Sequence, residues 1–325
     1  MPTADRLLYT GSPVKIVLAQ PRGFCAGVVR AIDIVERAIE ISDRPVYVRH
    51  EIVHNKHVVE SLRDKGATFV EDVDEIPDGA IAIFSAHGVA KSVEGEAVDR
   101  GLATIDATCP LVTKVHRQVA RLDRLGYEII LIGHDGHPEV EGTMGQLPGR
   151  ILLVQNIEDA ETVRVVDPEK VAYVTQTTLS LDDTAGIVAV LSRRFPAMPE
   201  PPTEDICYAT TNRQFSIRRL AEASDLVIVI GAPNSSNSNR LVEVAAQLGT
   251  AAHRIESADQ LNDEWFAGVD AVAITAGASV PEYLVDETVN YLVERFGAEV
   301  SEDPVGEPER VEFPLPKELR AASPA

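Results

Sequence analysis

The feature that most restricts the fold of this chain is an alternation of short apolar runs with helical patterns. Runs rich in Val, Ile and Leu occupy residues 16–19, 46–49, 81–84, 129–132, 171–175, 226–230 and 271–275. Between them, as after Cys25 and again after Cys109, apolar residues recur at helical spacing and form one stripe. Such alternation predicts parallel sheets that are covered by helices.

Three cysteines stand at the same place in this alternation. Each precedes a helical pattern, and a strand then ends 24 residues later, at Arg49, Gly133 or Gly231. The period of 84 to 98 residues is far too long for a solenoid repeat and fits three α/β domains of similar build. The cysteines in question are Cys25, Cys109 and Cys207.

Polar side chains follow the strands of each repeat. His54, His137 and Ser235 lie 28 or 29 residues after the cysteines, and a further polar residue comes one strand later. Open α/β sheets bind ligands beyond the carboxyl ends of their strands, so we expect these side chains to face ligands. If the three domains face one centre, the cysteines meet there as well. The later polar residues are His87, Thr177 and Ser279.

The repeat suggests approximate domain boundaries. We expect α/β units at 1–101, 102–200 and 201–300, each carrying one cysteine; residues 1–14 need not pack with the first unit. A proline cluster at 196–202 marks the second boundary by its composition. Residues 301–325, rich in proline and acidic residues, are expected to form an irregular tail.

Composition excludes several classes of function. The formal net charge of −21 and a pI near 4.7 disfavour binding to nucleic acid or to an anionic membrane. No apolar run approaches the length of a membrane span, and the N-terminal residues lack the apolar core of a signal peptide. Three scattered cysteines do not suggest disulfides, so we expect a protein of the reducing cytoplasm.

The cysteines leave several interpretations open. A single cysteine is most often a small buried apolar residue, but three equivalent ones favour a metal site. Zinc would take a histidine as fourth ligand, with His54, His87 and His137 as candidates. A cubane iron–sulfur cluster on three cysteines would keep one iron without a protein ligand. A cysteine hydrolase needs only one of the three thiols.

Two polar loops add chemistry of their own. In GHDGHPEVEG, His137 and Glu139 are two residues apart, and in an extended segment they would point the same way, as anion ligand and general acid. The loop PNSSNSN precedes an expected helix at 240–248 and could bind phosphate through hydroxyl and amide groups. Neither a P-loop nor a dinucleotide fingerprint is present.

Taken together, these stretches resemble the 4-hydroxy-3-methylbut-2-enyl diphosphate reductase family, which catalyses the last step of the non-mevalonate isoprenoid pathway. The resemblance covers about residues 16–281 and is specific, because its motifs occur in order without departure. They are PRGFCAGVVRAI, HEIVHN, FSAHGV, DATCPLVTKVH, GHDGHPEVEGT, VTQTTLS, DICYATTNRQ, GAPNSSNSNRL and TAGASVPE.

The resemblance implies three α/β domains in pseudo-threefold arrangement around one [4Fe–4S] cluster. Cys25, Cys109 and Cys207 would hold the cluster, and the substrate's hydroxyl would bind its open iron. Glu139 would deliver protons, and Thr177 would orient Glu139 and the hydroxyl end of the substrate. The diphosphate would be bound, with His137 nearby, by His54, His87, Ser235, Ser236, Asn237 and Ser279.

The implied reaction is a reductive dehydroxylation that yields isopentenyl and dimethylallyl diphosphate. Two electrons would come from an external donor such as ferredoxin or flavodoxin, which on this acidic chain would need a locally basic docking patch. The rival from another class is a non-catalytic iron–sulfur sensor. A sensor accounts for the cysteines but has no use for the polar residues that suit a diphosphate.

Overall fold

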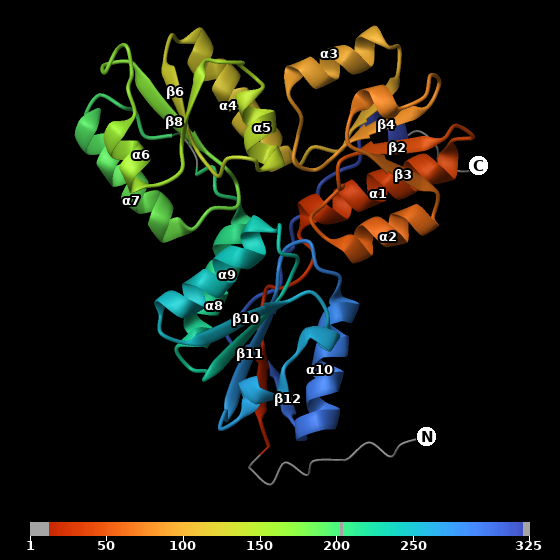
Figure 1. Ribbon diagram of the computed structural model, residues 1–325, viewed down its shortest axis with the longest axis vertical. Coiled ribbons are helices and arrows are strands. Elements are labelled where there is room, and N and C mark those ends of the chain that lie inside the picture. The colour runs from red at the N-terminus through yellow and green to blue at the C-terminus, as the bar shows by residue number, and fades with distance from the viewer. Residues whose placement is uncertain (1–12, 202–203, 321–325) are drawn as a thin grey trace. The chain divides into compact units, whose positions relative to one another are not determined.

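The computed structural model describes residues 13–201 and 204–320 and has a mixed α/β fold with parallel sheets (Figure 1). The chain forms two compact units. One comprises Met1–Cys25 and Tyr208–Arg310, and the other comprises Ala26–Cys207 and Val311–Ala325. No helix in the described part of the chain is long and apolar enough to cross a membrane.

The first unit contains one sheet of five parallel strands. Its order is β10 (Ala251–Ile255), β9 (Leu226–Ile230), β11 (Ala271–Ala276), β1 (Lys15–Leu18) and β12 (Glu299–Glu302). Its helices are α8 (Tyr208–Ala221), α9 (Ser236–Gln247) and α10 (Glu282–Phe296), with short 3-10 turns at Ala258–Gln260 and Asp263–Phe266.

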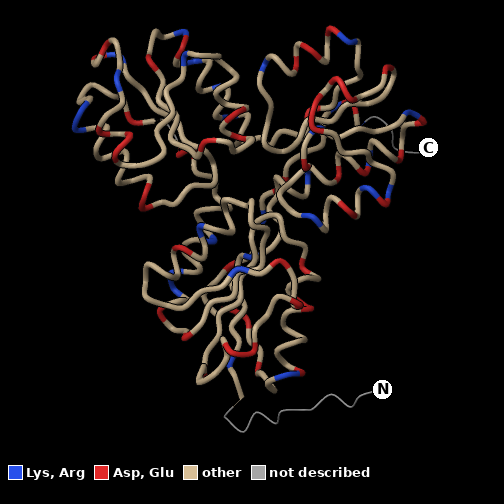
Figure 2. Tube along the Cα trace, viewed as in Figure 1, with Lys and Arg blue, Asp and Glu red and all other residues tan. Residues whose placement is uncertain are grey.

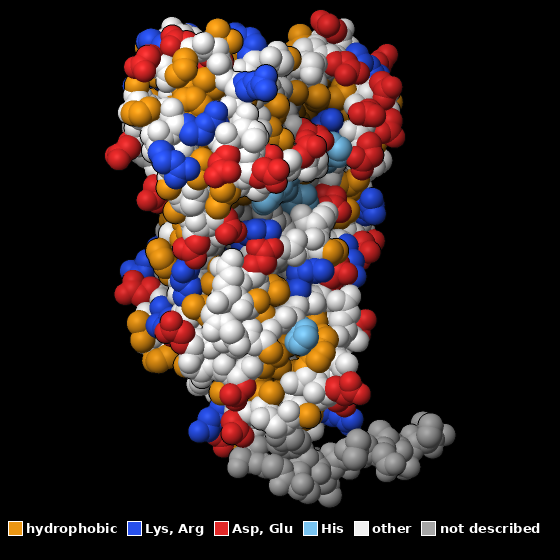
Figure 3. Space-filling view, turned by 60° about the vertical axis from the view of Figure 1, so that its left-hand side comes forward, with side chains coloured by type: hydrophobic (Ala, Val, Ile, Leu, Met, Phe, Trp, Pro, Cys, Tyr) orange, Lys and Arg blue, Asp and Glu red, His pale blue; other side chains and the backbone are white. Residues whose placement is uncertain are grey.

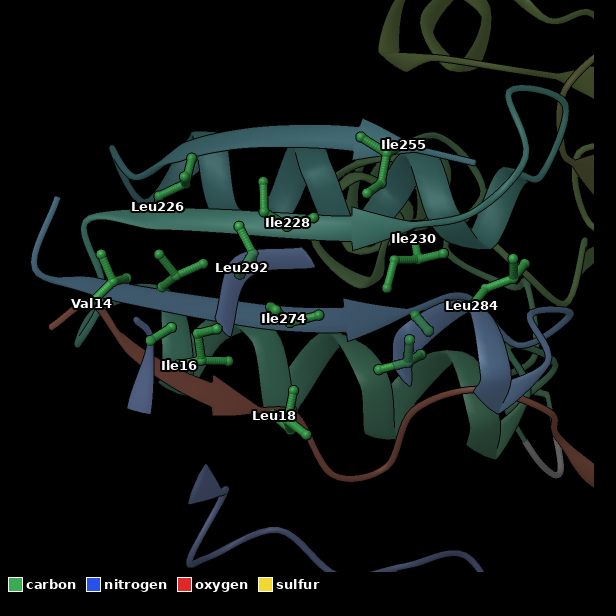
Figure 4. Packing of buried hydrophobic residues seen from close by; sticks show 14 of the residues in the cluster. Val14, Ile16, Leu18, Leu226, Ile228, Ile230, Ile255, Ile274, Leu284 and Leu292 are labelled. Atoms are coloured by element: carbon green, nitrogen blue, oxygen red, sulfur yellow. The ribbon is translucent and has the colours of Figure 1, made fainter. Parts of the chain in front are cut away.

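Strands β9 and β11 are buried on both faces of this sheet. Alternate residues of a strand point to opposite sides, so each strand contributes to two cores. Ile228 and Ile274 pack toward Leu284 and Leu292 of α10 (Figure 4). The intervening residues, such as Val227 and Ala273, pack with the apolar sides of α8 and α9. Burial of each such aliphatic side chain contributes about 1.5–3 kcal/mol, so the sheet holds the loops at its strand ends firmly.

The second unit contains two smaller parallel sheets. The first has the order β3 (Ala67–Val70), β2 (Val46–Arg49), β4 (Ile81–Phe84), β5 (Ala103–Asp106). The second has the order β7 (Ile151–Val154), β6 (Glu128–Ile132), β8 (Val171–Thr175). The helices of this unit are α1 (Ala26–Ile41), α2 (Lys56–Asp64), α3 (Lys91–Asp99), α4 (Pro110–Arg124), α5 (Pro138–Met144), α6 (Ile157–Thr162), α7 (Leu181–Arg194) and α11 (Lys317–Arg320), with a 3-10 turn at Val73–Glu75.

The three sheets share one plan, which confirms the predicted α/β fold class. In each, the chain runs from a central strand to a neighbour on one side and then returns to the other side, as in β3-β2-β4, β7-β6-β8 and β10-β9-β11. A switch point therefore lies between β2 and β4, between β6 and β8, and between β9 and β11. Such switch points open the crevices in which α/β sheets bind ligands.

Two strands belong to a different sheet than the segments expected at 1–101 and 102–200 would place them in. Strand β1 pairs with β11 and β12 in the last sheet, while β5 pairs with β4 in the first. The expectation took each repeat as one continuous segment, and pairing between distant strands leaves no local mark in a sequence. The tail expected to be irregular begins with the last residues of β12 and includes α11, and residues 1–12, Pro202 and 321–325 lie outside the described residues.

Candidate functional site

The three cysteines form no disulfide, are half-buried, and have their backbone N–H groups anchored in the same way. The backbone N–H of Cys25 donates to the carbonyl of Ala278 at 3.0 Å. Cys109 N–H donates to Ala86 O at 3.0 Å, and Cys207 N–H donates to Thr177 O at 2.9 Å. Each acceptor lies in the loop that follows the third strand of a repeat, namely β11, β4 and β8. The repeat read from the sequence is therefore also a repeat of backbone contacts.

Each cysteine directly precedes a helix: α1, α4 or α8. The partial positive charge of a helix N-terminus favours a thiolate, which is the form that binds metal. Three thiols in equivalent settings fit an iron–sulfur cluster in chemical type and number. Among the described residues, no three His, Cys, Asp or Glu side chains are grouped so as to hold a metal ion. Cys25 belongs to one compact unit, and Cys109 and Cys207 to the other.

Three histidines come together in the second unit, from both of its sheets. His54 follows β2, His87 follows β4, and His137 follows β6. The ring centroids of His54 and His87 are 4.1 Å apart and stacked, and His137 lies 5.2 Å from His54 and 5.9 Å from His87. Figure 3 shows one patch of histidine atoms near the middle of the face it presents, and further histidine atoms apart from that patch. The structure thus brings together the three histidines singled out in the sequence.

His87 and His137 are electrically neutral near pH 7. Burial lowers the pKa of His87 well below its usual value, and the neighbouring His54 and His137 lower it further. Burial, together with His54 and His134, lowers the pKa of His137 to about 3. A bound anion would raise these pKa values again, because negative charge stabilises the imidazolium form. The group is therefore suited to take up protons when it binds an anion.

Glu139 lies at the second position of α5, with 3% of its surface exposed. Thr177 donates to both carboxylate oxygens, from its backbone N–H to Oε1 at 2.6 Å and from its hydroxyl to Oε2 at 2.9 Å. Burial raises the pKa of Glu139 to about 7, although the two hydrogen bonds from Thr177 oppose the rise, and Asp205 adds to it. The side chain can thus hold or release a proton near neutral pH.

The segment from His137 to Glu139 is only partly extended, whereas the prediction assumed an extended segment throughout. His137 has extended backbone angles, but Glu139 lies in the first turn of α5. Pro138 occupies the first turn of α5, where proline is favoured because its missing N–H is not needed. His137 is the N-cap residue, and its Nδ1 accepts the N–H of Glu139 at 3.1 Å. In the neutral ring the proton is therefore on Nε2, so His137 can donate a hydrogen bond from that atom.

The serine-rich loop of the first unit also differs from the expectation. Helix α9 begins at Ser236 rather than near residue 240, so Ser236 and Asn237 lie in its first turn. Ser235 is the N-cap residue, and its Oγ accepts the N–H of Ser238 at 3.3 Å. Serine and asparagine near a helix start often act as caps, and from the sequence alone that role could not be told apart from phosphate binding.

Asn237 is the most informative residue of this loop. It is 4% exposed, and neither polar atom of its side-chain amide has a hydrogen-bond partner in the described structure. Ser279 lies in the loop after β11, on the other side of the β9–β11 switch point. An unsatisfied buried amide is costly, so Asn237 at a helix N-terminus points to a polar ligand, such as phosphate, that supplies the missing bonds.

Two further features were not found from the sequence. Asp205 is buried, pairs with Lys114 at 3.3 Å and accepts the N–H of Thr175, which fixes the approach to Cys207. The second is the contact of α5 with the segment after His87, where a Cβ on Gly145 would overlap the Cβ of Ala90. Glycines three apart in EGTMGQ were the available signal for that close approach.

The carboxamide of Gln146 holds the same two elements together. Its Nε2 donates to Val89 O and to Gly142 O, both at 3.0 Å. Gly142 itself lies against Gly88, since a Cβ on Gly142 would be 3.0 Å from Gly88 O. This contact joins the helix that carries Glu139 to the loop that carries His87.

Comparison with known proteins agrees with this geometry. The family described as LytB protein matches residues 16–293. The 4-hydroxy-3-methylbut-2-enyl diphosphate reductase of Neisseria meningitidis serogroup C is 58% identical over 94% of this chain and 95% of its own length. That of Acinetobacter baylyi is 55% identical over 94% of this chain and 98% of its own.

Solved structures extend the likeness to the fold. The E-1-hydroxy-2-methyl-but-2-enyl-4-diphosphate reductase from Plasmodium falciparum aligns with a TM-score of 0.89 and 38% identity, over 95% of this chain and 97% of that one. A structure of (E)-4-hydroxy-3-methyl-but-2-enyl diphosphate reductase aligns with a TM-score of 0.61 and 35% identity, over 86% and 99%. On the strength of the matched motifs, the shared fold and these identities, the chain belongs to the LytB family.

Proposed function

We propose that this chain is an oxidoreductase that converts 4-hydroxy-3-methylbut-2-enyl diphosphate to isopentenyl and dimethylallyl diphosphate, the terminal step of the non-mevalonate pathway. Membership of the LytB family and the reductase relatives support the assignment. The observation that carries it is the buried pair of Glu139 and Thr177, because Thr177 also holds Cys207 through its carbonyl. A proton donor and a thiol ligand are thus attached to one residue.

In the proposed enzyme, Cys25, Cys109 and Cys207 hold one [4Fe–4S] cluster per chain. Their number, thiol chemistry and equivalent backbone anchors fit that group. When bound, the cluster supplies single electrons and a Lewis-acidic iron with an open position. The chain's own residues then bind the substrate and hold or transfer its protons.

Neutral donors and titratable imidazoles would bind the diphosphate. His137 offers its Nε2–H, and Asn237 offers a buried amide whose hydrogen bonds are unmade. Anchoring the diphosphate fixes the reacting end of the substrate, so that binding energy from a remote group lowers the barrier. The full set that we assign to the diphosphate is His54, His87, His137, Ser235, Ser236, Asn237 and Ser279.

Glu139 would supply the proton on which loss of the hydroxyl group depends. Hydroxide is a poor leaving group, and protonation turns it into water. The pKa of about 7 leaves a sizeable fraction of Glu139 protonated under neutral conditions. The hydroxyl of Thr177 donates to the carboxyl group of Glu139. In the proposed enzyme it would orient that group and the hydroxyl end of the substrate.

The electron donor would be a ferredoxin or a flavodoxin, and we expect the enzyme to work in the cytoplasm without nucleic-acid or membrane partners. Asp and Glu residues are spread along the chain in both compact units (Figure 2), in line with the net charge of −21. Such donors are themselves acidic in many cases, so docking would need a locally basic patch. Electrostatic attraction at that patch would raise the association rate.

The test begins with purification under nitrogen, an absorption spectrum, and assays of iron and sulfide. We expect a brown protein that reduces the allylic diphosphate when a strong chemical reductant is added. Glu139→Gln is expected to keep the iron and to abolish turnover. A brown protein without turnover would support the iron–sulfur sensor instead, and a colourless protein that binds zinc would exclude the cluster.

A further inference from the structure

Residues 302–309, which we call the C-terminal strap, lie beyond the part of the chain that the family matches. They nevertheless contact the loop that leads to Cys25. Glu302 accepts a hydrogen bond from Gln20 Nε2 at 3.2 Å and pairs with Arg22 at 2.8 Å. Gly306 lies directly against Gln20, since a Cβ added to Gly306 would be 2.6 Å from the Cβ of Gln20. Strap and loop therefore pack without room for a side chain between them.

The strap also ends on a buried arginine that contacts the same loop. Arg213, on α8, has a side chain that is 0% exposed, and its Nη1 lies 3.1 Å from both carboxylate oxygens of Glu309. The Nη2 of Arg213 donates to the carbonyl of Gly23 at 2.7 Å. Gly23 is two residues before Cys25, so one guanidinium connects the strap to the cysteine loop.

The other end of the strap is attached to α8 as well. Asp303 is buried and pairs with Arg219, one and a half turns beyond Arg213. The strap therefore has a fixed start at Asp303 and a fixed end at Glu309. All of these contacts lie within one compact unit.

The charge balance makes Glu309 the decisive residue. A buried guanidinium is unfavourable unless a carboxylate neutralises it, and Glu309 is the carboxylate in contact with Arg213 among the described ion pairs. Without that charge, Arg213 would be driven toward water and away from Gly23 O. Gly23 has a φ of +67°, which glycine adopts without strain, so the hydrogen bond to its carbonyl is a contact that selects this conformation of the flexible loop.

We propose that the C-terminal strap is a positioning element for Cys25, acting through Glu309 and Arg213 on the carbonyl of Gly23. The proposal rests on the proposed function, in which Cys25 is a ligand of the metal centre. The strap has no contact with substrate in this scheme. It fixes the loop in the conformation that presents the Cys25 thiol.

The experiment compares Glu309→Gln with Glu307→Gln in the full-length chain. Glu307 is an exposed strap residue of the same charge, so its variant is the matched control. The metal-free chains are alkylated with a limiting amount of iodoacetamide, and mass spectrometry measures labelling at Cys25, Cys109 and Cys207. The ratio between cysteines of one molecule serves as the internal standard. In parallel, iron release to a chelator is timed for the loaded chains.

In Glu309→Gln we expect Cys25 labelling to rise relative to the other two cysteines by about fivefold, the effect of a modest local destabilisation. Iron release should be faster in that variant, while Glu307→Gln behaves as the unmodified chain. An equal rise at all three cysteines, or an unchanged ratio, would overturn the proposal. The labelling ratio needs no turnover, so absence of reductase activity would count against the proposed function alone.

Discussion

The raised pKa of Glu139 makes a thermodynamic prediction that is separate from catalysis. Its folded pKa is about 7, against an ordinary value of 4.5. The folded state therefore binds its proton more tightly than the unfolded chain does. Stability from this group is fully present below pH 4.5 and is lost as the pH rises toward and through 7.

The magnitude follows from the size of the shift. One pKa unit corresponds to about 1.4 kcal/mol, so ionising Glu139 in the folded state costs about 3 kcal/mol in total. Raising the pH from 5.0 to 8.5 should therefore lower the unfolding free energy through this group by about 2–3 kcal/mol. The loss is smaller than the full value of about 3 kcal/mol because the carboxyl of the unfolded chain is already mostly ionised at pH 5.0. Glu139→Gln removes the titration but keeps the shape of the side chain and an acceptor for Thr177 N–H.

The assay is denaturant unfolding of the full-length chain and of Glu139→Gln at both pH values. The quantity to compare is the difference in unfolding free energy between the two proteins, because the other titrating groups then cancel. We expect the variant to gain about 2–3 kcal/mol on the original chain between pH 5.0 and 8.5. A difference that is the same at both pH values would refute the assignment of a buried, proton-retaining carboxyl at residue 139.

Four further predictions test the site. Thr177→Val removes the hydroxyl donor to Oε2 of Glu139, so the pKa of Glu139 should rise further. The alkaline limb of the profile of turnover against pH should then move to higher pH. An unmoved limb would contradict the role of the Thr177 hydroxyl in setting that pKa. Cys109→Ser should lose most of its iron, and a variant with full visible absorbance would disprove the ligand assignment. Pyrophosphate should bind more tightly as the pH falls from 8 to 6, because a bound anion raises the pKa values that burial lowers at His87 and His137. Titration calorimetry of the original chain in two buffers should show that protons are taken up on binding. Binding without proton uptake would count against the histidine group as the anion site. Gly145→Ala should lower the free energy of unfolding by roughly 2 kcal/mol and reduce turnover, because the new Cβ overlaps Ala90. The control Gly95→Ala, in open space on α3, should leave stability unchanged or raise it. Equal effects of the two substitutions would contradict a close contact at Gly145.

Local patterns predicted much of the fold and the composition of the site. The apolar runs predicted strands such as β9 and β11, which are buried on both faces and so have no polar residues to interrupt them. Strands β3, β5, β7, β10 and β12 were not predicted. Four of them carry exposed or polar residues, whereas β7 is apolar and was passed over although its sequence ILLV is typical of a buried strand. The constant distance from each cysteine to the end of a strand predicted a structural repeat, and the equivalent backbone contacts of the cysteines confirm it.

Strand pairing over long range and the exact starts of α5 and α9 were not predicted from the sequence. Nothing near Lys15 indicates that β1 pairs with β11, more than 250 residues away. The capping roles of His137 and Ser235 could not be assigned from the sequence, because histidine and serine serve equally well as ligands and as capping groups. The raised pKa of Glu139 depends on burial, which the spacing of residues does not reveal.

The pairing of β1 has a consequence for the order in which the protein is made. A ribosome releases residues 15–25 early, but β1 has no sheet to join until β11 and β12 have been synthesised. The strap that contacts the Cys25 loop follows later still, up to Glu309. The first cysteine of the chain is thus among the last to reach its final place. A metal centre that needs Cys25 would report that translation has passed residue 309, and prematurely ended chains would fail to retain iron.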